Sequence, residues 1–490
     1  MDEQQDDHRL IAERKKKLEE LRKKGLNPYP HRFDPTHHAK ELQTIHAHLE
    51  PSASSGETAT IAGRIMLLRR MGKASFGHLQ DQTGRIQIWL KADVLGEQYE
   101  LLSLVDIGDI IGVQGEVLKT KTGEVTVLAK SIVMLTKTIR PLPEKYHGLK
   151  DEEERFRKRY LDLTMNPDVK EIFLNRAKIV KAVRETLQSK GFLDVEMPTL
   201  QTIYGGANAR PFVTHINAWD MRMYLSISPE LYLKRLLVGG LEKVFTICKN
   251  FRNEGVDQTH NPEFTMMECY WAYADYNDMM DLTEELFENA CKAVHGGTTV
   301  LRNNVTIDFK RPWRRITMKD AIKEYASIDV DALGDDELQV IAQKNEIHSK
   351  VRGEIIQGLF EHFCEEKLVQ PTHVIDHPIE TTPLCKTLRN GNPVMIERFE
   401  SFIMGKEVSN AYSELNDPIL QRTLLEDQAR QLRAGADEAH PMDEDFVQAI
   451  EYGMPPAGGL GIGIDRMVIM LLGVEGIRDV IFFPTMRPEK

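Results

Sequence analysis

The sequence predicts an α+β protein in which a small β-barrel precedes a larger domain of helices and strands. The chain has 490 residues, which is too long for one compact core, so we expect two or three domains. Between Thr60 and about Thr138 it forms short β-rich runs separated by turn residues. From Asn166 onward, helical and strand patterns mix over more than 300 residues, which is enough for one large domain.

The strand-rich segment fits a small barrel of the OB type. It holds five apolar runs within about 80 residues, and glycines at positions 63, 84, 115 and 123 mark turns or bulges. Barrels of this type commonly hold single-stranded nucleic acid on their outer face. The patterns divide the chain into a basic helix with its lead-in (1–58), the barrel (59–140), a linker (141–165) and the large domain (166–490), with a helical insertion at about 275–369.

The segment before the barrel predicts a basic helix. Between His8 and Lys24, eight lysines and arginines stand against three glutamates, and Ile11, Leu18 and Leu21 share one helical face. Two interpretations stay open. The helix is either a solvated surface element or an arm that touches RNA phosphates.

Composition excludes several classes of protein. No apolar run approaches the roughly 20 residues of a membrane span, and the acidic N-terminus is no signal peptide, so we expect a soluble protein. The five cysteines are far apart and form no CxxC pair, which is typical of a reducing cytoplasm and argues against a zinc site. A net charge of −12 argues against general nucleic-acid binding, so we expect no DNA partner.

One charged segment predicts a ligand-binding hairpin between Phe251 and Tyr273. Strand alternation would place Arg252 and Glu254 on one face, and a turn would bring Phe264 back opposite them. A cation, a carboxylate and an aromatic ring in one pocket suit a phosphate, an amino group and a flat base. The alternative is a charged hairpin with one core phenylalanine.

A second segment near the C-terminus predicts a strand with one cleared face. Gly459, Gly461 and Gly463 alternate, which lets a ligand or another backbone lie against the strand. Arg466 follows where an apolar helical run begins, and it could stack on a base or pair with a phosphate. The spacing is not GxGxxG, so a Rossmann site is excluded.

Together these two segments resemble motifs 2 and 3 of the class II aminoacyl-tRNA synthetases. The helix from Phe173 to Leu200 is similar to motif 1. Within the class, the chain most resembles the lysyl-tRNA synthetases of the bacterial type, over nearly its whole length. The phrases that carry this likeness include GGANARPF, SPELYLKRLLVGG, HNPEFTMME, YADY and NAYSELNDP. The resemblance implies a catalytic domain built on an antiparallel sheet flanked by helices.

The resemblance also assigns roles by position. Arg252 and Arg466 would be catalytic. Arg252 would hold the α-phosphate and the carboxylate, Phe264 would stack on adenine, and Arg466 would cover the other face of the nucleotide. ATP binding would involve Arg252, Glu254, His260, Asn261, Phe264 and Arg466. Pro198 and its helix would lie at the interface of a homodimer.

Carboxylates near the predicted pocket indicate a basic substrate. A carboxylate–ammonium contact is a charge-assisted bond worth about 1.5–3 kcal/mol, so lysine would be favoured and aspartate repelled. For each carboxylate, a surface ion pair is the alternative. The resemblance implies that lysine is bound by Gly206, Glu230, Glu268, Tyr270, Asn410, Tyr412 and Glu414.

A hairpin with its tip at Gly405 predicts a metal site. A two-residue turn there would put Glu400 and Glu407 on one face, and such oxygen ligands suit Mg²⁺. Asn410 and Glu414 alternate onto the opposite face, so a bulge near Val408–Ser409 is needed if all serve one site. The expected metal ligands are Glu400, Glu407 and Glu414, holding several Mg²⁺ ions per subunit that bridge ATP phosphates. A solvated acidic hairpin is the alternative.

In the barrel, Phe76 lies among basic residues that include Arg69, and Gln87 follows one strand later. Basic residues around an exposed aromatic ring suit unstacked RNA bases, although such a phenylalanine could instead fill the barrel core. The resemblance implies that Arg69, Phe76 and Gln87 read the anticodon of a lysine tRNA.

The resemblance implies a lysine–tRNA ligase that forms lysyl-adenylate from lysine and ATP and then transfers lysine to the 3′ end of its tRNA. Two alternatives remain open. One is a lysine ligase that modifies a protein such as elongation factor P, although those relatives resemble the catalytic domain alone. The other is an RNA-binding paralogue without activity, which the intact charged motifs disfavour.

Overall fold

The computed structural model describes residues 2–143, 149, 151–433 and 441–489. The chain divides into two compact units, Met1–Leu149 and Lys150–Lys490. Among the described residues, no helix is both long enough and apolar enough to cross a membrane.

The first unit contains the predicted OB-type barrel. Five strands close on themselves in the order β1-β2-β3-β5-β4. Side chains of β3 alternate between the barrel core and the outer face, with Ile86, Ile88 and Leu90 at most 2% exposed. The strands are β1 (Ser54–Met71), β2 (Ala74–Gln80), β3 (Arg85–Lys91), β4 (Ile110–Lys119) and β5 (Val125–Thr136), with α3 (Ala92–Leu95) and the 3-10 helix η1 (Gly96–Leu104) between β3 and β4.

The N-terminal basic helix, α1 (Asp2–Lys23), packs on this barrel, and α2 (Ala39–Ile45) follows it. Arg14 donates hydrogen bonds to Thr138 Oγ1 at 2.6 Å and to the Ile107 carbonyl at 2.9 Å. Leu21 is buried. Arg14 therefore anchors the helix to the barrel. Other basic residues of the helix lie at the surface, among them Lys15, Lys16, Arg22 and Lys23.

The second unit is built on an eight-stranded sheet in the order β14-β15-β16-β17-β18-β11-β10-β6. Neighbours in its centre are antiparallel, whereas the edge pairs β14–β15 and β6–β10 are parallel. This confirms the antiparallel-rich sheet that the resemblance implied. The strands are β6 (Leu193–Asp194), β10 (Lys243–Phe251), β11 (Glu263–Ala272), β14 (Arg314–Thr317), β15 (Thr372–Pro378), β16 (Met395–Ile403), β17 (Lys406–Ser413) and β18 (Ala457–Gly463).

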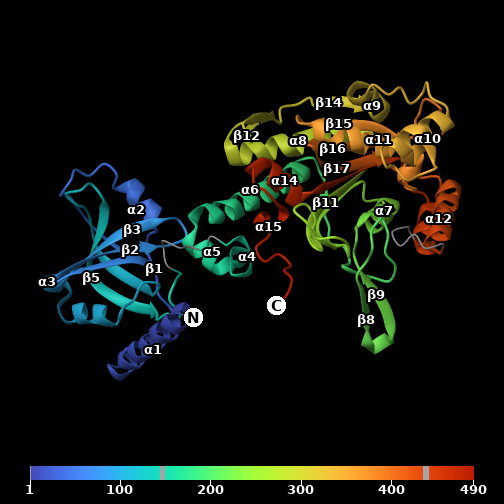
Figure 1. Cartoon of the computed structure of the whole chain (residues 1–490). Coiled ribbons are helices and arrows are strands. Elements are labelled where there is room, and N and C mark those ends of the chain that lie inside the picture. The colour runs from blue at the N-terminus through green and yellow to red at the C-terminus, as the bar shows by residue number, and fades with distance from the viewer. Residues whose placement is uncertain (1, 144–148, 150, 434–440, 490) are drawn as a thin grey trace. The chain divides into compact units, whose positions relative to one another are not determined.

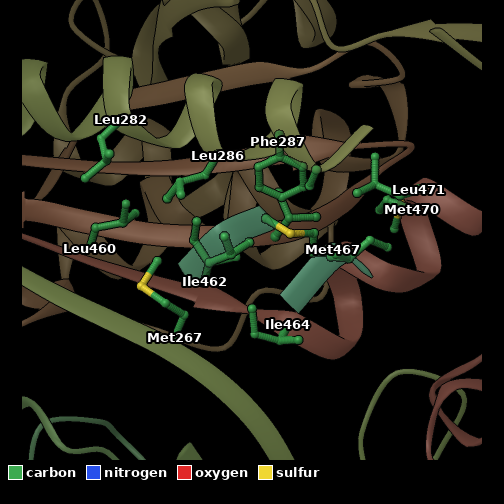
Figure 2. Close-up of a cluster of buried hydrophobic side chains, with 14 of the residues drawn as sticks. Met267, Leu282, Leu286, Phe287, Leu460, Ile462, Ile464, Met467, Met470 and Leu471 are labelled. Carbon is green, nitrogen blue, oxygen red and sulfur yellow. The ribbon is translucent and has the colours of Figure 1, made fainter. Parts of the chain in front are cut away.

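One face of this sheet is covered by α6 (Pro167–Ser189), α8 (Tyr276–His295) and α14 (Ile464–Leu472) (Figure 1). Figure 2 shows Met267, Leu460 and Ile462 packed with leucines and a phenylalanine of α8 and with methionines of α14. Because strand side chains alternate between faces, the residues between these apolar ones point the other way. Glu268 and Gly461 are examples, and they are paired across β11 and β18.

The opposite face carries α7 (Glu230–Val238), α12 (Pro418–Arg433) and α13 (Glu444–Glu451). Leu231 and Leu237 of α7 pack with Phe446 and Ile450 of α13 in a second apolar cluster. These helices leave part of the face uncovered, and the candidate site lies there.

The stretch at 275–369 is only partly the helical insertion that the sequence predicted. Its first helix, α8, lies in the main core, and β14 joins the main sheet. The helical periodicity did not distinguish these cases, because an amphipathic helix has the same apolar spacing whether it packs on a sheet or on other helices. A separate apolar cluster does unite α9 (Met318–Ala326), α10 (Asp335–Lys344) and α11 (Arg352–Phe363), while β12 (Thr299–Arg302), β13 (Val305–Asp308) and the 3-10 helix η3 (Glu365–Lys367) complete the stretch.

The predicted linker at 141–165 is too long. Residues 151–165 form α4 (Glu152–Arg157) and α5 (Arg159–Met165) and belong to the second unit. Arg159 is buried and donates to Asp162 Oδ2 at 2.7 Å and to the Arg478 carbonyl at 2.8 Å. The charged composition suggested a linker, because the sequence does not show that Arg159 and Asp162 form a buried ion pair.

A small three-stranded sheet and short helices complete the unit. The sheet has the order β7-β9-β8, and Pro198 lies exposed just before it. These elements are β7 (Leu200–Gln201), β8 (Val213–Ile216), β9 (Met221–Leu225), α15 (Ile477–Val480) and the 3-10 helices η2 (Asn217–Trp219) and η4 (Ile379–Thr381).

Candidate functional site

A cavity of about 350 Å³ opens on the uncovered face of the main sheet. Its walls come from β11, β16, β17 and β18, from the start of α7 and from the loop between β10 and β11. Every residue predicted to bind ATP, lysine or metal lines this cavity, so the fold brings together segments from 206 to 466.

Glycines of β18 make the floor of the cavity. A Cβ atom on Gly459 would lie 1.9 Å from Glu414 Oε1 and 2.6 Å from a ring carbon of Tyr270. A Cβ on Gly461 would meet Met266 Cε at 3.2 Å. The alternating glycines therefore clear one face of the strand, as predicted.

The β10–β11 hairpin carries the predicted cation and aromatic ring. Phe264 pairs with Asn250, and the Arg252 guanidinium lies 5.1 Å from the centre of the Phe264 ring. The prediction that Arg252 and Glu254 share a strand face is wrong, because β10 ends at Phe251 and both residues lie in the loop. The buried Arg252 Nε has no hydrogen-bond partner among the described residues, and burial lowers the pKa of its guanidinium.

Asp257 shapes the loop that carries His260. Its carboxylate accepts hydrogen bonds from the backbone N–H groups of Thr259 at 2.6 Å and His260 at 2.8 Å. Although partial burial opposes it, the hydrogen bond with the His260 ring, together with these backbone bonds, lowers the pKa of Asp257 well below its usual range. The His260 ring stays exposed, with Nε2 at 3.5 Å from Arg466 Nη2.

Asn261 and Glu254, also predicted for ATP, differ in burial. Asn261 is buried and donates to the Glu263 carbonyl at 2.6 Å, while its own Oδ1 is without a partner in the described part of the chain. Glu254 is exposed and accepts from the Arg210 backbone N–H at 3.3 Å. The asparagine thus holds the loop, and the glutamate remains at the cavity mouth.

The β16–β17 hairpin has the predicted turn and bulge. Ile403 pairs with Lys406 across the turn residues Met404 and Gly405, both with positive φ. The register then shifts, since Ser401 pairs with Ser409 and Phe402 pairs with Glu407, which leaves Val408 as the extra residue. The bulge predicted near Val408–Ser409 is therefore confirmed.

The bulge places Glu400, Glu407 and Asn410 along one wall. Burial and the negative charge of Glu407 raise the pKa of Glu400 to about 7, against the opposing effect of Arg398. Arg398 donates to Glu400 Oε1 at 2.5 Å and to Asn410 Oδ1 at 3.1 Å. Two neighbouring carboxylates fit a divalent cation, which would stabilise the charged form of Glu400.

Glu414, the third expected metal ligand, lies apart from Glu400 and Glu407. It lies four residues beyond Asn410, on the order of 13 Å along a strand, and forms an ion pair with Lys234. No group of three or more potential ligands is arranged for a metal within the described ranges. The sequence did not predict this ion pair, because Lys234 comes from a helix far away in the sequence.

Glu230, Glu268 and Glu414 are all buried at the other end of the cavity. Tyr412 donates its hydroxyl to Glu230 Oε2 at 2.9 Å. Glu268 accepts from Ser228 Oγ at 2.9 Å and from the Tyr270 hydroxyl at 3.3 Å. The predicted amino-acid site is therefore a pocket with three buried carboxylates.

Burial and neighbouring carboxylates raise the pKa values of two carboxyl groups in this pocket. Burial and the charge of Glu230 raise the pKa of Glu268 to about 8. Burial raises the pKa of Glu414 to about 8 as well, although Lys234 opposes the shift. Both groups would be stabilised as carboxylates by a positively charged ligand.

Lys234 is a site residue that sequence reasoning missed. It lies on α7 one turn after Glu230 and donates to Glu230 Oε1 at 2.6 Å. The spacing of four residues was the available signal, since side chains at i and i+4 meet on a helix. Gly206 packs against the base of the Glu230 side chain, because a Cβ there would lie 2.8 Å from Glu230 Cβ.

The barrel carries its predicted residues on the outer face. Phe76 pairs with Arg69 on β1 and with Trp89 on β3, and the two aromatic rings stack at 5.2 Å. Gln87 donates to Glu124 Oε2 at 2.6 Å and accepts from Thr126 Oγ1 at 2.8 Å. Phe76 is half-buried on this face and not in the barrel core. Trp89, which the sequence reasoning did not select, extends the aromatic surface.

Comparison with known proteins places the chain in a class and then in a family. Residues 151–487 match the family model for class II tRNA synthetases (D, K and N), and residues 59–135 match that of the OB-fold nucleic acid binding domain. The chain is therefore a class II tRNA synthetase by fold and family.

Similar proteins identify the family of the chain within this class. The Lysine--tRNA ligase of Thermoanaerobacter pseudethanolicus is 51% identical over 486 residues, covering 98% of this chain and 96% of the relative. Those of Clostridium novyi and Carboxydothermus hydrogenoformans are 50% and 51% identical, covering 98% and 99% of this chain and 95% and 99% of the relatives. The chain belongs to the lysine–tRNA ligase family.

Proposed function

We propose that this protein activates L-lysine with ATP and transfers it to the 3′ end of a lysine tRNA. The observation that carries the choice of amino acid is the buried pocket that holds Glu230, Glu268 and Glu414. Among the described residues, Lys234 is the one cation that forms ion pairs with them. Burying carboxylates without partners is costly, so the pocket favours a ligand with ammonium groups. An aspartate side chain would be repelled there.

The other end of the cavity suits the nucleotide. Phe264 offers a flat surface for adenine, and Arg466 lies half-buried where α14 begins. Arg252, with an unpartnered buried Nε, would hold the α-phosphate and the substrate carboxylate. The lysine carboxylate would attack the α-phosphorus in line and displace pyrophosphate, with positioning and electrostatics supplying the rate. The tRNA hydroxyl would then attack the carbonyl of the adenylate, lose its proton and displace AMP.

Glu400 and Glu407 are the proposed Mg²⁺ ligands. When bound there, Mg²⁺ would supply positive charge that offsets the ATP phosphates. Arg398 orients Glu400, and Arg466 orients Glu407 through two hydrogen bonds.

Further parts of the proposal concern partners. The outer face of the barrel, with Arg69, Phe76 and Gln87, would bind the anticodon. Exposed Leu193, Pro198 and Leu200 would lie in a homodimer interface. The five cysteines are free thiols, which is typical of the cytoplasm, the location proposed for the enzyme.

One set of assays tests the function against its alternatives. Pyrophosphate exchange with each amino acid, followed by charging of total tRNA, should give exchange only with lysine and lysine attached to tRNA. Exchange with lysine but no charging of tRNA would favour a lysine ligase that acts on a protein. Lack of exchange with any amino acid would favour an inactive RNA-binding paralogue.

A further inference from the structure

Lys234 is fully buried and lies between two carboxylates of the proposed amino-acid pocket. Its ammonium donates to Glu230 Oε1 at 2.6 Å and forms an ion pair with Glu414. It also lies 5.6 Å from the centre of the Tyr412 ring, whose hydroxyl holds the other oxygen of Glu230. The lysine and the tyrosine together fix both oxygens of Glu230.

The formal charges of the pocket leave room for a basic ligand. In the described part of the chain, the ammonium of Lys234 is the one cation that forms an ion pair with any of the three carboxylates, so the four groups carry a formal charge of −2 when ionised. Lysine has two ammonium groups, and its carboxylate would be matched by Arg252. Bound lysine would therefore neutralise the site, which matters because unpaired buried charges are strongly unfavourable.

We propose that Lys234 is a positioning residue that keeps Glu230 and Glu414 apart and sets the pocket charge to match the two ammonium groups of lysine. This inference rests on the proposed function. Without the ammonium, two buried carboxylates that face each other share a proton, as like charges in one site do. They would then be withdrawn from the substrate, and one of the three would stay protonated when lysine is bound.

The first test is Lys234→Met, which keeps an unbranched apolar stem of similar length. The lysine KM in pyrophosphate exchange should rise at least tenfold at pH 7.5, while the ATP KM stays within twofold. The pH above which the lysine KM levels off should also become higher, because the more negative pocket raises the pKa of its carboxyl groups. Equal changes in both KM values, or an unchanged pH profile, would overturn the role.

A double variant separates charge matching from packing. Lys234→Met with Glu414→Gln removes one positive and one negative charge and restores a pocket charge of −2. It should bind lysine better than either single variant and return the pH profile toward that of the wild type. A double variant no better than Lys234→Met would show that the lysine acts by packing alone.

The barrel offers a matched control. Lys137 is also fully buried between two carboxylates, donating to Asp106 at 2.5 Å and to Asp109 at 2.8 Å. Lys137→Met should lower thermal stability but leave the lysine KM within twofold. If the wild-type protein shows no lysine-dependent exchange, the proposed function fails; if it does and Lys234→Met behaves like the control, only the role of Lys234 fails.

Discussion

Arg466 donates two hydrogen bonds to Glu407, one to its backbone carbonyl at 2.7 Å and one to Oε2 at 2.9 Å. The arginine proposed for the nucleotide and a carboxylate proposed for Mg²⁺ are therefore one unit. A change at either residue should affect both ATP and metal dependence.

Replacing Glu407 by Gln should weaken this unit. We expect the Mg²⁺ concentration for half-maximal pyrophosphate exchange to rise roughly 10- to 100-fold, because a metal site loses about this much when an anchoring group is removed. The lysine KM at saturating ATP and Mg²⁺ should change little. Exposed Glu242 provides the control as Glu242→Gln, and a Mg²⁺ response equal to that of this control would contradict the assignment.

Gly459→Ala should close the amino-acid pocket. The added methyl would lie 1.9 Å from Glu414 Oε1, so the carboxylate or the strand must shift. We expect the lysine KM in pyrophosphate exchange to rise more than tenfold. Gly297→Ala is the matched control, since no atom lies within 4 Å of a Cβ there. Similar lysine KM values for both variants would show that the glycine is not needed for space.

The affinity for lysine should depend on pH through the pocket carboxylates. The pKa values of Glu268 and Glu414 are raised to about 8, so ammonium binding must displace protons below that pH. The lysine KM should fall as pH rises from 6.5 to 8, by roughly tenfold per pH unit for each proton displaced. Glu268→Gln should flatten this profile. A wild-type lysine KM that is constant over this range would refute the linkage.

The same two groups give a stability prediction of definite sign. A carboxyl group whose pKa is raised by folding stabilises the folded protein at low pH, and this contribution is lost as pH rises toward about 8. Lysine would supply the positive charge that the ionised carboxylates lack. Adding lysine should therefore raise the Tm of the protein more at pH 8.5 than at pH 6.5. An equal or smaller rise at pH 8.5 would contradict the pKa shifts.

Phe76→Ala should separate RNA binding from amino-acid activation. Base stacking on an aromatic ring contributes about 1–3 kcal/mol, so the tRNA KM in aminoacylation should rise roughly 5- to 150-fold. Pyrophosphate exchange without tRNA should be unchanged. Val133→Ala, at an exposed position of the same barrel, is the control. Equal tRNA KM values for the two variants would remove Phe76 from the RNA-binding surface.

Local sequence patterns determined much of this protein. Turn glycines and apolar runs predicted the barrel, and the alternating Gly459, Gly461 and Gly463 predicted a strand with one cleared face. Even the bulge at Val408 followed from the need to bring Glu407 and Asn410 to one wall. Such features depend on residues close in sequence, so their periodicity is visible without a structure.

Only the tertiary structure decided how the charges pair. Glu230 and Tyr412 are 182 positions apart, yet they share a hydrogen bond, and Lys234 joins Glu230 to Glu414. Sequence spacing therefore did not reveal that Glu414 forms an ion pair with Lys234. Likewise, only the tertiary structure showed that α8 belongs to the main core and not to a helical insertion, because this depends on what packs against it. Pairing of buried charges is set by long-range packing, because each group takes the partner that the fold brings within reach.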